Sequence, residues 1–514
     1  MRVLDAEAMR EVDRAAIEDL GIPSLVLMEN AAIGLADAIG ETYPEATSAA
    51  IFCGPGNNGG DGLALARHLT ARGYQVEVRL VHGGGSLSPD AGVQLEICKK
   101  QGLTIHEYGP GDSKREAVDS ASHLDVVVDA LFGTGLTRPL AGHFAEIVEA
   151  INTLSVPCVA VDLPSGLNGS TATIMGPHIQ AELTVTFAAP KIAHVLLPAA
   201  EAVGEVVIAD LGIPRDLIER AAGDLHLLVV EELMGHLSPR PPSSHKGDFG
   251  HALIMAGSVG KAGAAILAAR GAVRAGAGLV TVATPESVAQ TVELGSLESM
   301  TLPLAADPHG GLSEESATTI LDFASGKHVL AVGPGLGSSA STVQVIRRVV
   351  AEVEIPVVLD ADGLNAFAGA MELLKGSGCE KILTPHPGEL ARLLGVSTAE
   401  IQVDRVASAR SAARLAGSVV VLKGFQTLVA EPDGAVFVNP TGNPGMASGG
   451  TGDVLTGIIT GLLSQGLEPT MAARLGVFVH GSAGDRAMTD CGQIALTASD
   501  LLVFLPDAFR RLGS

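Results

Sequence analysis

Gly449-Gly450-Thr451-Gly452-Asp453-Val454-Leu455 is the stretch that decides the fold of the second half of the chain. Its glycines and threonine lead directly into an apolar run of helical length that ends at Leu463. A glycine loop that opens a helix leaves backbone N–H groups free, with the positive end of the helix dipole behind them, and this arrangement binds phosphate oxygens. Asp453 then has two interpretations: a general base that takes a proton from a substrate hydroxyl, or an acidic residue that caps the helix.

Composition bounds the class of protein. A chain of 514 residues exceeds one ordinary hydrophobic core, so we expect two or more domains. A formal net charge of −24 and an aromatic content of 3% argue against a nucleic-acid partner or an anionic membrane surface. They leave room for an anionic small substrate, because loop amides can form a local positive site on an acidic protein.

Cysteine usage and the N-terminus predict a cytoplasmic protein. The five cysteines are scattered and form no CxxC pair, which argues against a zinc site or a disulfide framework. The segment 1–13 is too charged for a signal peptide, and no apolar run reaches membrane-spanning length. We therefore expect no membrane partner.

Strand and helix patterns alternate through the first half of the chain. This rhythm predicts a parallel sheet with helices on both faces, that is, a Rossmann-like, doubly wound α/β domain. The expected strands are 49–53, 74–81, 125–129 and 157–162, and the expected helices are 5–20, 24–39, 63–72, 90–101 and 144–151.

Three loops of the first half follow strand ends, where open α/β sheets bind ligands. They are 54–62, 133–138 and 164–166. Each loop by itself is also compatible with a plain turn. Together they bring Asn58, Asp129, Asp162 and Ser165 to one edge, and hard oxygen ligands of this kind suit an alkali or alkaline-earth cation.

A linker-like run, Ser238–Ser244, follows a change in composition, and we place the domain boundary between residues 222 and 223. The second half again alternates, with expected strands at 252–256, 279–283, 329–332, 356–360, 381–384 and 419–422. It is a second α/β domain whose strand ends deliver glycines, a lysine and carboxylates to one edge.

Several residues at that edge have competing interpretations. Lys423–Thr427 is compatible with a β-turn, but it also offers donors for a nucleotide phosphate. His386 is either a helix-capping histidine or a substrate contact, with Glu389 behind a magnesium ion. Asp360 and Asp362 are either turn residues or ligands at the shared edge.

The Gly-x-Gly-Asp loop resembles that of the ribokinase-like superfamily. The fuller set of motifs in the second half is similar to the NAD(P)H-hydrate dehydratases: His245–His251, Gly276–Val280, Gly333–Gly337, Leu359–Asp362, Thr384–Glu389 and Asn443–Asp453. In the first half, Asn57–Gly62, Asp129–Leu136 and Asp162–Gly166 resemble the NAD(P)H-hydrate epimerases. The bacterial fusion of the two, epimerase first, matches nearly the whole chain.

This resemblance implies a metabolite-repair enzyme. Residues 1–222 would interconvert the R and S hydrates of NADH and NADPH. Residues 223–514, with a ribokinase-like fold, would dehydrate the S hydrate, with ADP as phosphoryl donor and AMP and phosphate as products. It also implies K⁺ in the epimerase and Mg²⁺ with ADP in the dehydratase. We separately expect a homo-oligomer.

The resemblance assigns residues in the dehydratase domain. Asp453 would be the catalytic base, and Gly263, Ala264, Gly337 and His386 would line the hydrated dinucleotide. ADP would be held by Lys423, Gly424, Phe425, Gln426, Thr427 and Gly452. Glu389 is a tentative magnesium ligand, because His386-Pro-Gly-Glu389 departs from the Asn-x-x-Glu of many kinases of the superfamily.

In the epimerase domain, Asp162 is the candidate acid/base. Contacts to the hydrate would come from Asn57, Asn58, Gly59, Gly60, Asp61, Gly133, Thr134, Gly135, Leu136, Thr137, Arg138 and Asp162. Potassium would lie among Asn58, Asp129 and Ser165.

Two other functions compete with this one. A ribokinase-like vitamin or sugar kinase with a non-catalytic N-terminal binding domain would prefer ATP and release a stable phosphorylated product. A first half that serves only as a protein- or RNA-binding scaffold is disfavoured by the acidic composition and by the presence of Asp162 and Asn58.

Overall fold

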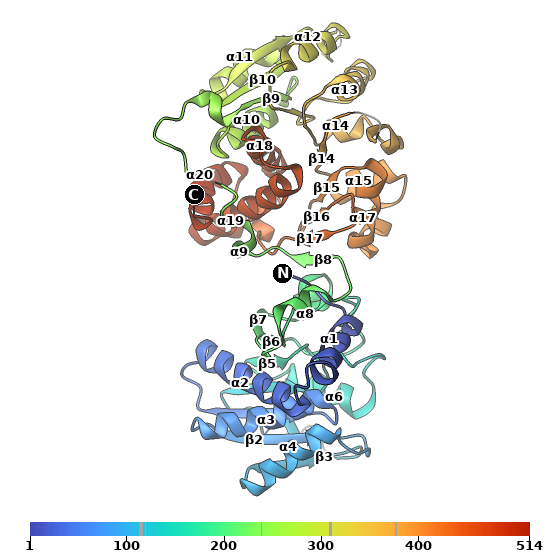
Figure 1. Ribbon diagram of the computed structural model, residues 1–514, viewed down its shortest axis with the longest axis vertical. Coiled ribbons are helices and arrows are strands. Elements are labelled where there is room, and N and C mark those ends of the chain that lie inside the picture. Colours follow the sequence, from blue (N-terminus) through green and yellow to red (C-terminus); the bar gives the residue numbers. More distant parts are fainter. Residues whose placement is uncertain (113–116, 119, 238, 308–310, 376–377, 514) are drawn as a thin grey trace. The chain divides into compact units, whose positions relative to one another are not determined.

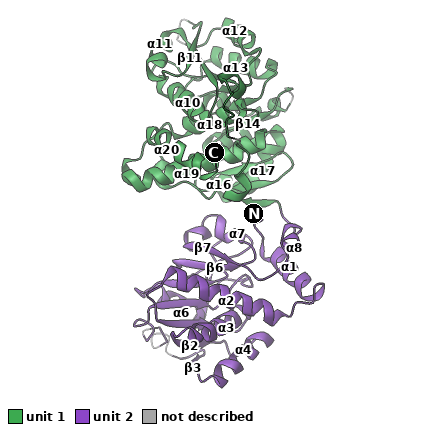
Figure 2. Cartoon of the chain, turned by 60° about the vertical axis from the view of Figure 1, so that its left-hand side comes forward, with its two compact units in different colours: residues 1, 224–514 green, residues 2–223 purple. Residues whose placement is uncertain are grey.

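The computed structural model describes residues 1–112, 117–118, 120–237, 239–307, 311–375 and 378–513. Ser238, the first residue of the predicted linker, lies outside the described residues. The chain divides into two compact units: Arg2–Gly223, and Met1 together with Asp224–Ser514 (Figure 2). We call them the N-terminal and the C-terminal unit.

In the described part of the N-terminal unit, seven strands form one parallel sheet in the order β3-β2-β1-β4-β5-β6-β7 (Figure 1, blue to green). The strands are β1 Ser48–Cys53, β2 Gln75–Val81, β3 Thr104–Tyr108, β4 Val126–Ala130, β5 Cys158–Val161, β6 Leu183–Phe187 and β7 Glu205–Ala209. The chain first builds outward from β1 to β3 and then continues from β4 on the other side. The switch point therefore lies between β1 and β4, where doubly wound sheets bind ligands.

The N-terminal sheet is buried on both faces. Ile51 and Cys53 of β1 belong to one apolar core with α1–α4, whereas Ala50 and Phe52 belong to another core with α6. Strands covered on both faces are near-continuous apolar runs, as the sequence pattern predicts. The helices are α1 Ala6–Glu18, α2 Ser24–Thr42, α3 Asn57–Ala71, α4 Pro89–Lys100, α6 Gly142–Ile151, α7 Ile192–Val195 and α8 Arg215–Glu219.

In the described part of the C-terminal unit, ten strands form a sheet in the order β11-β10-β9-β12-β13-β14-β15-β16-β17-β8. Strands β15, β16 and β17 pair antiparallel, and the remaining neighbours pair parallel. They are β8 Leu225–Leu227, β9 His251–Met255, β10 Leu279–Pro285, β11 Met300–Leu304, β12 Val329–Val332, β13 Val357–Leu359, β14 Lys381–Leu383, β15 Val419–Leu422, β16 Leu428–Ala430 and β17 Val436–Val438.

One face of this sheet packs against α10, α18, α19 and α20, which share a single apolar core with β9, β12 and β15. The helices of the unit are α9 Val230–Leu233, α10 Ala262–Arg274, α11 Glu286–Gly295, α12 Glu315–Ala324, α13 Ala340–Glu352, α14 Asp362–Asn365, α15 Pro387–Leu394, α16 Thr398–Val403, α17 Arg405–Ala416, α18 Thr451–Ser464, α19 Pro469–Ala495 and α20 Ala498–Arg511.

The expected boundary of one helix at the N-terminal edge is wrong. We expected a loop at 54–62 and a helix from Leu63, but α3 already begins at Asn57. Asn57–Asp61 therefore form the first turns of a helix. The glycines that suggested a loop are there because a side chain would not fit: a Cβ on Gly59 would lie 1.9 Å from the carbonyl oxygen of Gly54.

Candidate active sites

Asp453 lies in the first turn of α18, at the edge where the parallel strands of the C-terminal unit end. The N-cap is Gly450, whose φ of 95° favours glycine, and a Cβ there would lie 2.5 Å from Leu267 Cδ1. Asp453 is therefore not the N-cap residue itself, but it is an acidic residue of the first turn, as the alternative interpretation expected. Its side chain is available for other work.

The surroundings of Asp453 suit a base that operates near neutral pH. Burial, and then the negative charge of Asp360, raise the pKa of Asp453 to about 7 despite the opposing effect of Lys423. Asp362 and Glu389 act in the same direction as Asp360. A carboxylate with a pKa near the working pH is efficient at accepting a proton.

Lys423 lies directly after β15 and beneath the first turn of α18. Its Nζ donates to Asp360 Oδ1 at 2.7 Å, and a Cβ on Gly452 would lie 3.3 Å from it. Burial acts to lower the pKa of Lys423, but Asp360 and Glu389 attract the ammonium more strongly and raise it. The other oxygen of Asp360 accepts a 2.8 Å hydrogen bond from Thr456 of α18, so the ammonium is held by a buried carboxylate.

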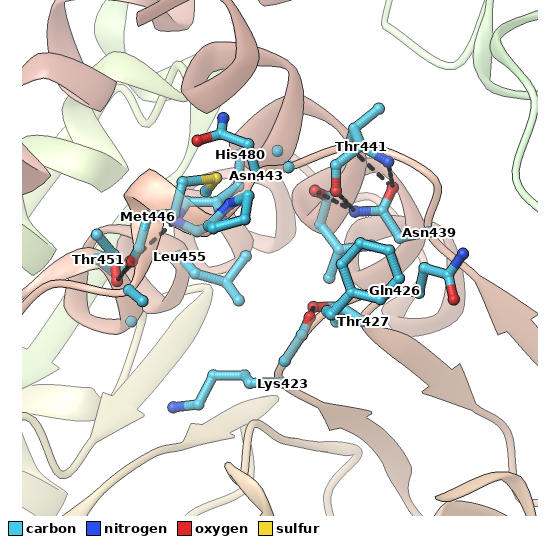
Figure 3. Close-up of a pocket in the computed structure, with 18 residues that line it drawn as sticks. Lys423, Gln426, Thr427, Asn439, Thr441, Asn443, Met446, Thr451, Leu455 and His480 are labelled. Carbon is cyan, nitrogen blue, oxygen red and sulfur yellow. Dashed lines mark hydrogen bonds between the residues drawn. The ribbon is translucent and has the colours of Figure 1, made fainter. Parts of the chain in front are cut away.

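A pocket of about 360 Å³ opens beside this lysine (Figure 3). This volume is in the usual range for small-molecule sites. Lys423–Thr427 and Gly452, the residues predicted to hold ADP, all line it. Asp453 is not among the residues that line it, although its helix neighbours Thr451 and Gly452 are.

Sequence reasoning missed the opposite wall of the pocket, which comes from the segment after β17 and from α19. Asn439, Thr441 and Asn443 line it with Met446 and His480 (Figure 3). Asn439 is buried and donates to Thr441 O and Val477 O, each at 3.1 Å. The run Asn439-Pro-Thr-Gly-Asn-Pro-Gly445, rich in turn residues just before the glycine loop, was the available signal.

His480 fixes the start of α18 from the side of the pocket. Its Nε2 lies 2.9 Å from the carbonyl oxygen of Thr451, and burial lowers its pKa to about 4. The ring is therefore neutral near pH 7 and can donate from Nε2 to that oxygen. The predicted histidine at this edge, His386, has a different position.

His386 caps α15, as one of its two interpretations predicted. Its Nδ1 accepts from the backbone of Gly388 and Glu389, and Glu389 Oε2 accepts from the His386 amide at 2.8 Å. Glu389 is buried and lies 3.9 Å from Lys423 Nζ. The side chain of His386 is half-exposed, so the capping role leaves room for a substrate contact.

Of the residues predicted to line the dinucleotide, Gly263 and Ala264 lie in the first turn of α10, and Gly337 lies in the loop after β12. The Gly337 amide donates to Asp362 Oδ2 at 2.7 Å, and Lys261 Nζ lies 3.4 Å from the same oxygen. A Cβ on Gly335 would lie 3.1 Å from the Cβ of Ala264, so the loop after β12 packs against α10. These residues do not line the 360 Å³ pocket. The charge of Asp362 acts to raise the pKa of Asp453, and the charge of Lys423 acts to lower it.

In the N-terminal unit, Asp129 and Ser165 form one buried cluster at the switch point. Ser165 donates to Asp129 from its hydroxyl at 2.7 Å and from its amide at 2.8 Å. Burial raises the pKa of Asp129 to about 6, although these hydrogen bonds oppose the shift.

Asn58 and Asp162 meet at Gly133. A Cβ on Gly133 would lie 2.8 Å from Asn58 Oδ1 and 3.2 Å from Asp162 Oδ2, so only glycine leaves room for both side chains. Asn58 Nδ2 is buried without a hydrogen-bond partner among the described residues. The rest of the loop, Thr134–Arg138, is partly or fully exposed, as a ligand-binding loop would be.

Asp162 is held by side chains that sequence reasoning missed. Its φ is 62°, an uncommon value for a residue other than glycine. Lys191 Nζ donates to Asp162 Oδ1 at 2.7 Å, and Thr186 donates to the same oxygen at 3.0 Å. His194 Nε2 lies 2.8 Å from the Asp162 carbonyl oxygen. No motif surrounds Lys191 in the sequence, so only the fold could reveal it.

No cluster of three or more His, Cys, Asp or Glu side chains that could hold a metal ion occurs among the residues that the structure describes. Within the same residues, no helix is both long and apolar enough to cross a membrane.

Each half of the chain matches a known protein family. Residues 252–507 match the family model described as NAD(P)H-hydrate dehydratase, and residues 24–193 match the model described as YjeF-related protein N-terminus. A curated bifunctional NAD(P)H-hydrate repair enzyme Nnr from Moorella thermoacetica is 44% identical, over 100% of this chain and 97% of the relative. The Escherichia coli enzyme of the same name is 35% identical, over 96% and 92%.

The chain belongs to the family of bifunctional NAD(P)H-hydrate repair enzymes. The predicted family is thereby confirmed, and so are the predicted fold classes, Rossmann-like and then ribokinase-like. Among solved structures, the ADP/ATP-dependent NAD(P)H-hydrate dehydratase from Bacillus subtilis, co-crystallised with ATP/Mg²⁺, is 34% identical. It covers 57% of this chain and 100% of its own, with a TM-score of 0.49.

Proposed function

We propose that this enzyme repairs hydrated NADH and NADPH with one activity in each unit. Residues 1–222 epimerise the R and S hydrates, and residues 223–514 dehydrate the S hydrate at the expense of ADP. The observation that carries the proposal is Asp453, a partly buried carboxylate with a raised pKa. It lies in the first turn of α18, next to Gly452 of the pocket wall, and its pKa responds to the charges of Asp360, Lys423 and Asp362.

The dehydratase step starts with Asp453 taking the proton from the hydroxyl of the hydrate. The hydrate oxygen attacks the terminal phosphorus of ADP, and the bond from that phosphorus to the AMP oxygen breaks. The amides at Gly450–Gly452 and the Lys423 ammonium stabilise the charge on the transferred group. Loss of a ring proton and cleavage of the carbon–oxygen bond then release phosphate and restore the double bond of NAD(P)H.

The pocket is assigned to the nucleotide. Its walls offer the predicted contacts of Lys423, Gly424, Phe425, Gln426, Thr427 and Gly452. Gly263, Ala264, Gly337 and His386 are assigned to the hydrated dinucleotide, on the other side of Asp453. This division leaves the base between a phosphoryl donor and a hydroxyl acceptor.

Magnesium fits this site as part of the nucleotide complex, since Mg²⁺ keeps several waters and binds through one or two carboxylates with substrate phosphates. The residue offered for it is Glu389, whose Oε2 already accepts the His386 amide. When bound, the ion would offset the charge of the diphosphate. An assay that compares Glu389→Gln with wild type over a range of magnesium concentrations tests this assignment.

In the epimerase, Asp162 serves as acid/base at the hydrated carbon, with Asn57–Asp61 and Gly133–Arg138 around the substrate. Potassium is assigned to Asn58, Asp129 and Ser165. Asn58 Nδ2 is buried and has no hydrogen-bond partner among the described residues, and a flip of the amide would put its oxygen in that position, where it could bind a cation. A bound K⁺ would offset the buried negative charge of Asp129. We also assign the enzyme to the cytoplasm. We further assign it to a homo-oligomer, and light scattering of the full chain measures the molar mass that tests this.

One assay separates this proposal from its competitors. NAD(P)H absorbance is followed after the full chain is mixed with an R/S hydrate mixture, ADP and magnesium. We expect full recovery in wild type, recovery of the S fraction alone in Asp162→Asn, and none in Asp453→Asn. A stable phosphorylated product in place of AMP and phosphate would favour the kinase function. Unchanged epimerisation in Asp162→Asn would favour a scaffold role for the N-terminal unit.

A further inference from the structure

The hydrogen bonds around Asp162 divide its two carboxylate oxygens into different roles. Oδ1 accepts from Lys191 Nζ at 2.7 Å and from Thr186 Oγ1 at 3.0 Å. Oδ2 receives no hydrogen bond from the described residues, and it lies 3.2 Å from the position that a Cβ would take on Gly133. The free oxygen therefore faces the glycine loop that is assigned to the substrate.

Lys191 is built into the fold in a way that fixes this division. Only 1% of the residue is exposed, and its Nζ also donates to Thr186 Oγ1 and to the Phe187 carbonyl, each at 2.9 Å. Its backbone amide donates to His194 Nδ1 at 2.9 Å. The neighbouring backbone pairs with Leu4, which anchors the loop to the N-terminal segment. An ammonium with three acceptors has little freedom to leave Asp162.

His194 holds the backbone of the same aspartate. Because Nδ1 accepts the Lys191 amide, the proton of a neutral ring is on Nε2, which donates to the Asp162 carbonyl oxygen at 2.8 Å. Burial, and then Lys191, lower the pKa of His194 to about 4, so the ring is neutral at physiological pH. This contact supports the positive φ of Asp162, which turns its side chain toward Gly133.

The titratable groups that face Asp162 come from three elements. Asp13 lies on α1, Asp61 on α3, and Lys191 and His194 at α7. Burial acts to raise the pKa of Asp162, but the charge and hydrogen bond of Lys191 lower it below its ordinary value. Burial is the largest cause that raises the pKa of Asp13 to about 6. Burial and the Asp162 charge raise that of Asp61 well above its ordinary value.

We propose that Lys191 is the positioning residue of the epimerase: it holds Asp162 Oδ1 and leaves Oδ2 as the atom that exchanges a proton with the hydrate. This inference rests on the proposed epimerase function. In the step itself, Oδ2 takes the hydroxyl proton, the bond from the hydrated carbon to the ring nitrogen breaks, and the nitrogen is protonated. Rotation and the reverse steps give the other epimer. Burial raises the pKa of Asp61 well above its ordinary value, so we assign Asp61 as the donor of the proton to the nitrogen.

The test measures R-to-S exchange in the full chain with potassium but without ADP, so that dehydration does not remove the S epimer. The two epimers are separated by chromatography, and kcat and KM are determined as a function of pH. Wild type is expected to show a kcat that is flat through the neutral range. The inference would be overturned if the kcat of wild type fell on the acidic side with a midpoint near pH 6 to 7 and the same fall (the acid limb of the profile) persisted in Asp13→Asn. This outcome needs no variant of Lys191. No exchange in wild type would instead refute the epimerase function itself.

Lys191→Met keeps the length of the side chain but removes its charge. We expect kcat at neutral pH to fall about 100-fold or more. The acid limb should move up by about one pH unit or more, because a buried carboxylate without its cation holds its proton more tightly. KM should change much less than kcat. A loss of kcat without movement of the acid limb would show a merely structural role and overturn the inference.

Two variants control the interpretation. Thr186→Val removes one donor to Oδ1 and keeps the ammonium, so kcat should fall by less and the acid limb should stay within the acidic range. Lys99→Met removes an exposed lysine of α4 and should match wild type. If Lys191→Met does not fold, the pH profiles of wild type and Asp13→Asn still test the inference, because an acid limb near pH 6 to 7 in both would contradict it.

Discussion

At the scale of single residues, the surroundings of Asp453 make its ionised form less stable, and the same effect makes it a better base. It is largely buried, and the negative charge of Asp360 acts on it in addition to the attraction of Lys423. The sequence places a carboxylate at a helix start, where the dipole alone would favour its ionised form. Burial and the acidic neighbours outweigh that effect, so the group becomes a base matched to neutral pH.

The pH profile of the dehydratase activity should therefore show one titration on its acidic side, that of Asp453. We expect kcat/KM for the S hydrate with ADP to rise with pH and to level off above about 7, because only the ionised Asp453 accepts the proton. Asp453→Asn should lower kcat by about 100-fold or more. Asp490→Asn, an exposed position on α19, is the control and should keep the wild-type profile. A profile without this titration would assign the base to another group.

The same shift predicts that Asp453 destabilises the C-terminal unit. The folded-state pKa of about 7 is above the ordinary 3.8, so ionisation in the folded state carries a penalty that is absent below pH 3.8 and complete above about 7. At about 1.4 kcal/mol per pKa unit, the penalty is at most about 4 kcal/mol. We expect Asp453→Asn to raise the unfolding free energy by about 1–3 kcal/mol near pH 8, and the gain should vanish as the pH falls toward about 4. Denaturant unfolding at several pH values measures this, and a gain independent of pH would contradict it.

At the scale of elements, the contact between α10 and α18 depends on glycine. A Cβ on Gly457 would lie 2.1 Å from the Ala268 carbonyl oxygen, and one on Gly461 would lie 2.5 Å from that of Ala272. On the facing helix, a Cβ on Gly271 would lie 2.7 Å from the Val454 carbonyl oxygen. Backbone-to-backbone approach of this kind fixes the position of α18, whose first turn contains Asp453, against α10.

Gly457→Ala should therefore affect both stability and catalysis. The added methyl group forces the two helices apart, and overpacking of this kind costs about 1–3 kcal/mol. We expect a lower unfolding free energy and a lower dehydratase kcat, since Asp453 moves with α18, whereas epimerisation should be unchanged. Gly40→Ala is the matched control, because nothing lies within 4 Å of a Cβ at that position in α2. Equal effects of the two substitutions would refute the role of the close contact.

At the scale of the whole molecule, each unit has its own sheet, and no apolar core described here is shared between the units. The assigned nucleotide pocket is formed only by residues of the C-terminal unit. We expect calorimetry to show two unfolding transitions, and ADP at about 100 times its Kd to stabilise one of them by about 2.7 kcal/mol. The hydrate mixture should raise the temperatures of both unfolding transitions, because both units are assigned a hydrate site. A single transition that shifts as a whole with ADP would show that the units unfold together.

The sequence predicted many of the strands that form near-continuous apolar runs, because burial on both faces leaves a strong local pattern, but it did not predict the equally buried β6 or β16. Strands β12 and β15 coincide with the expected ranges 329–332 and 419–422. It did not predict the helical state of Asn57–Asp61, because local glycine content suggested a loop while tertiary contacts required glycine within a helix. It also missed the pocket wall at Asn439–Asn443, which is recognisable only when the antiparallel strands bring it opposite Lys423.

The sequence by itself determined the family, the fold class of each half, and the identity of the carboxylates and glycine loops at the strand ends. These properties are encoded in short, contiguous patterns. Only the tertiary structure decided the electrostatic state of Asp453 and the presence of Lys191 beside Asp162. Both depend on residues far apart in the chain whose distances, and the exclusion of water between them, exist only in the folded protein.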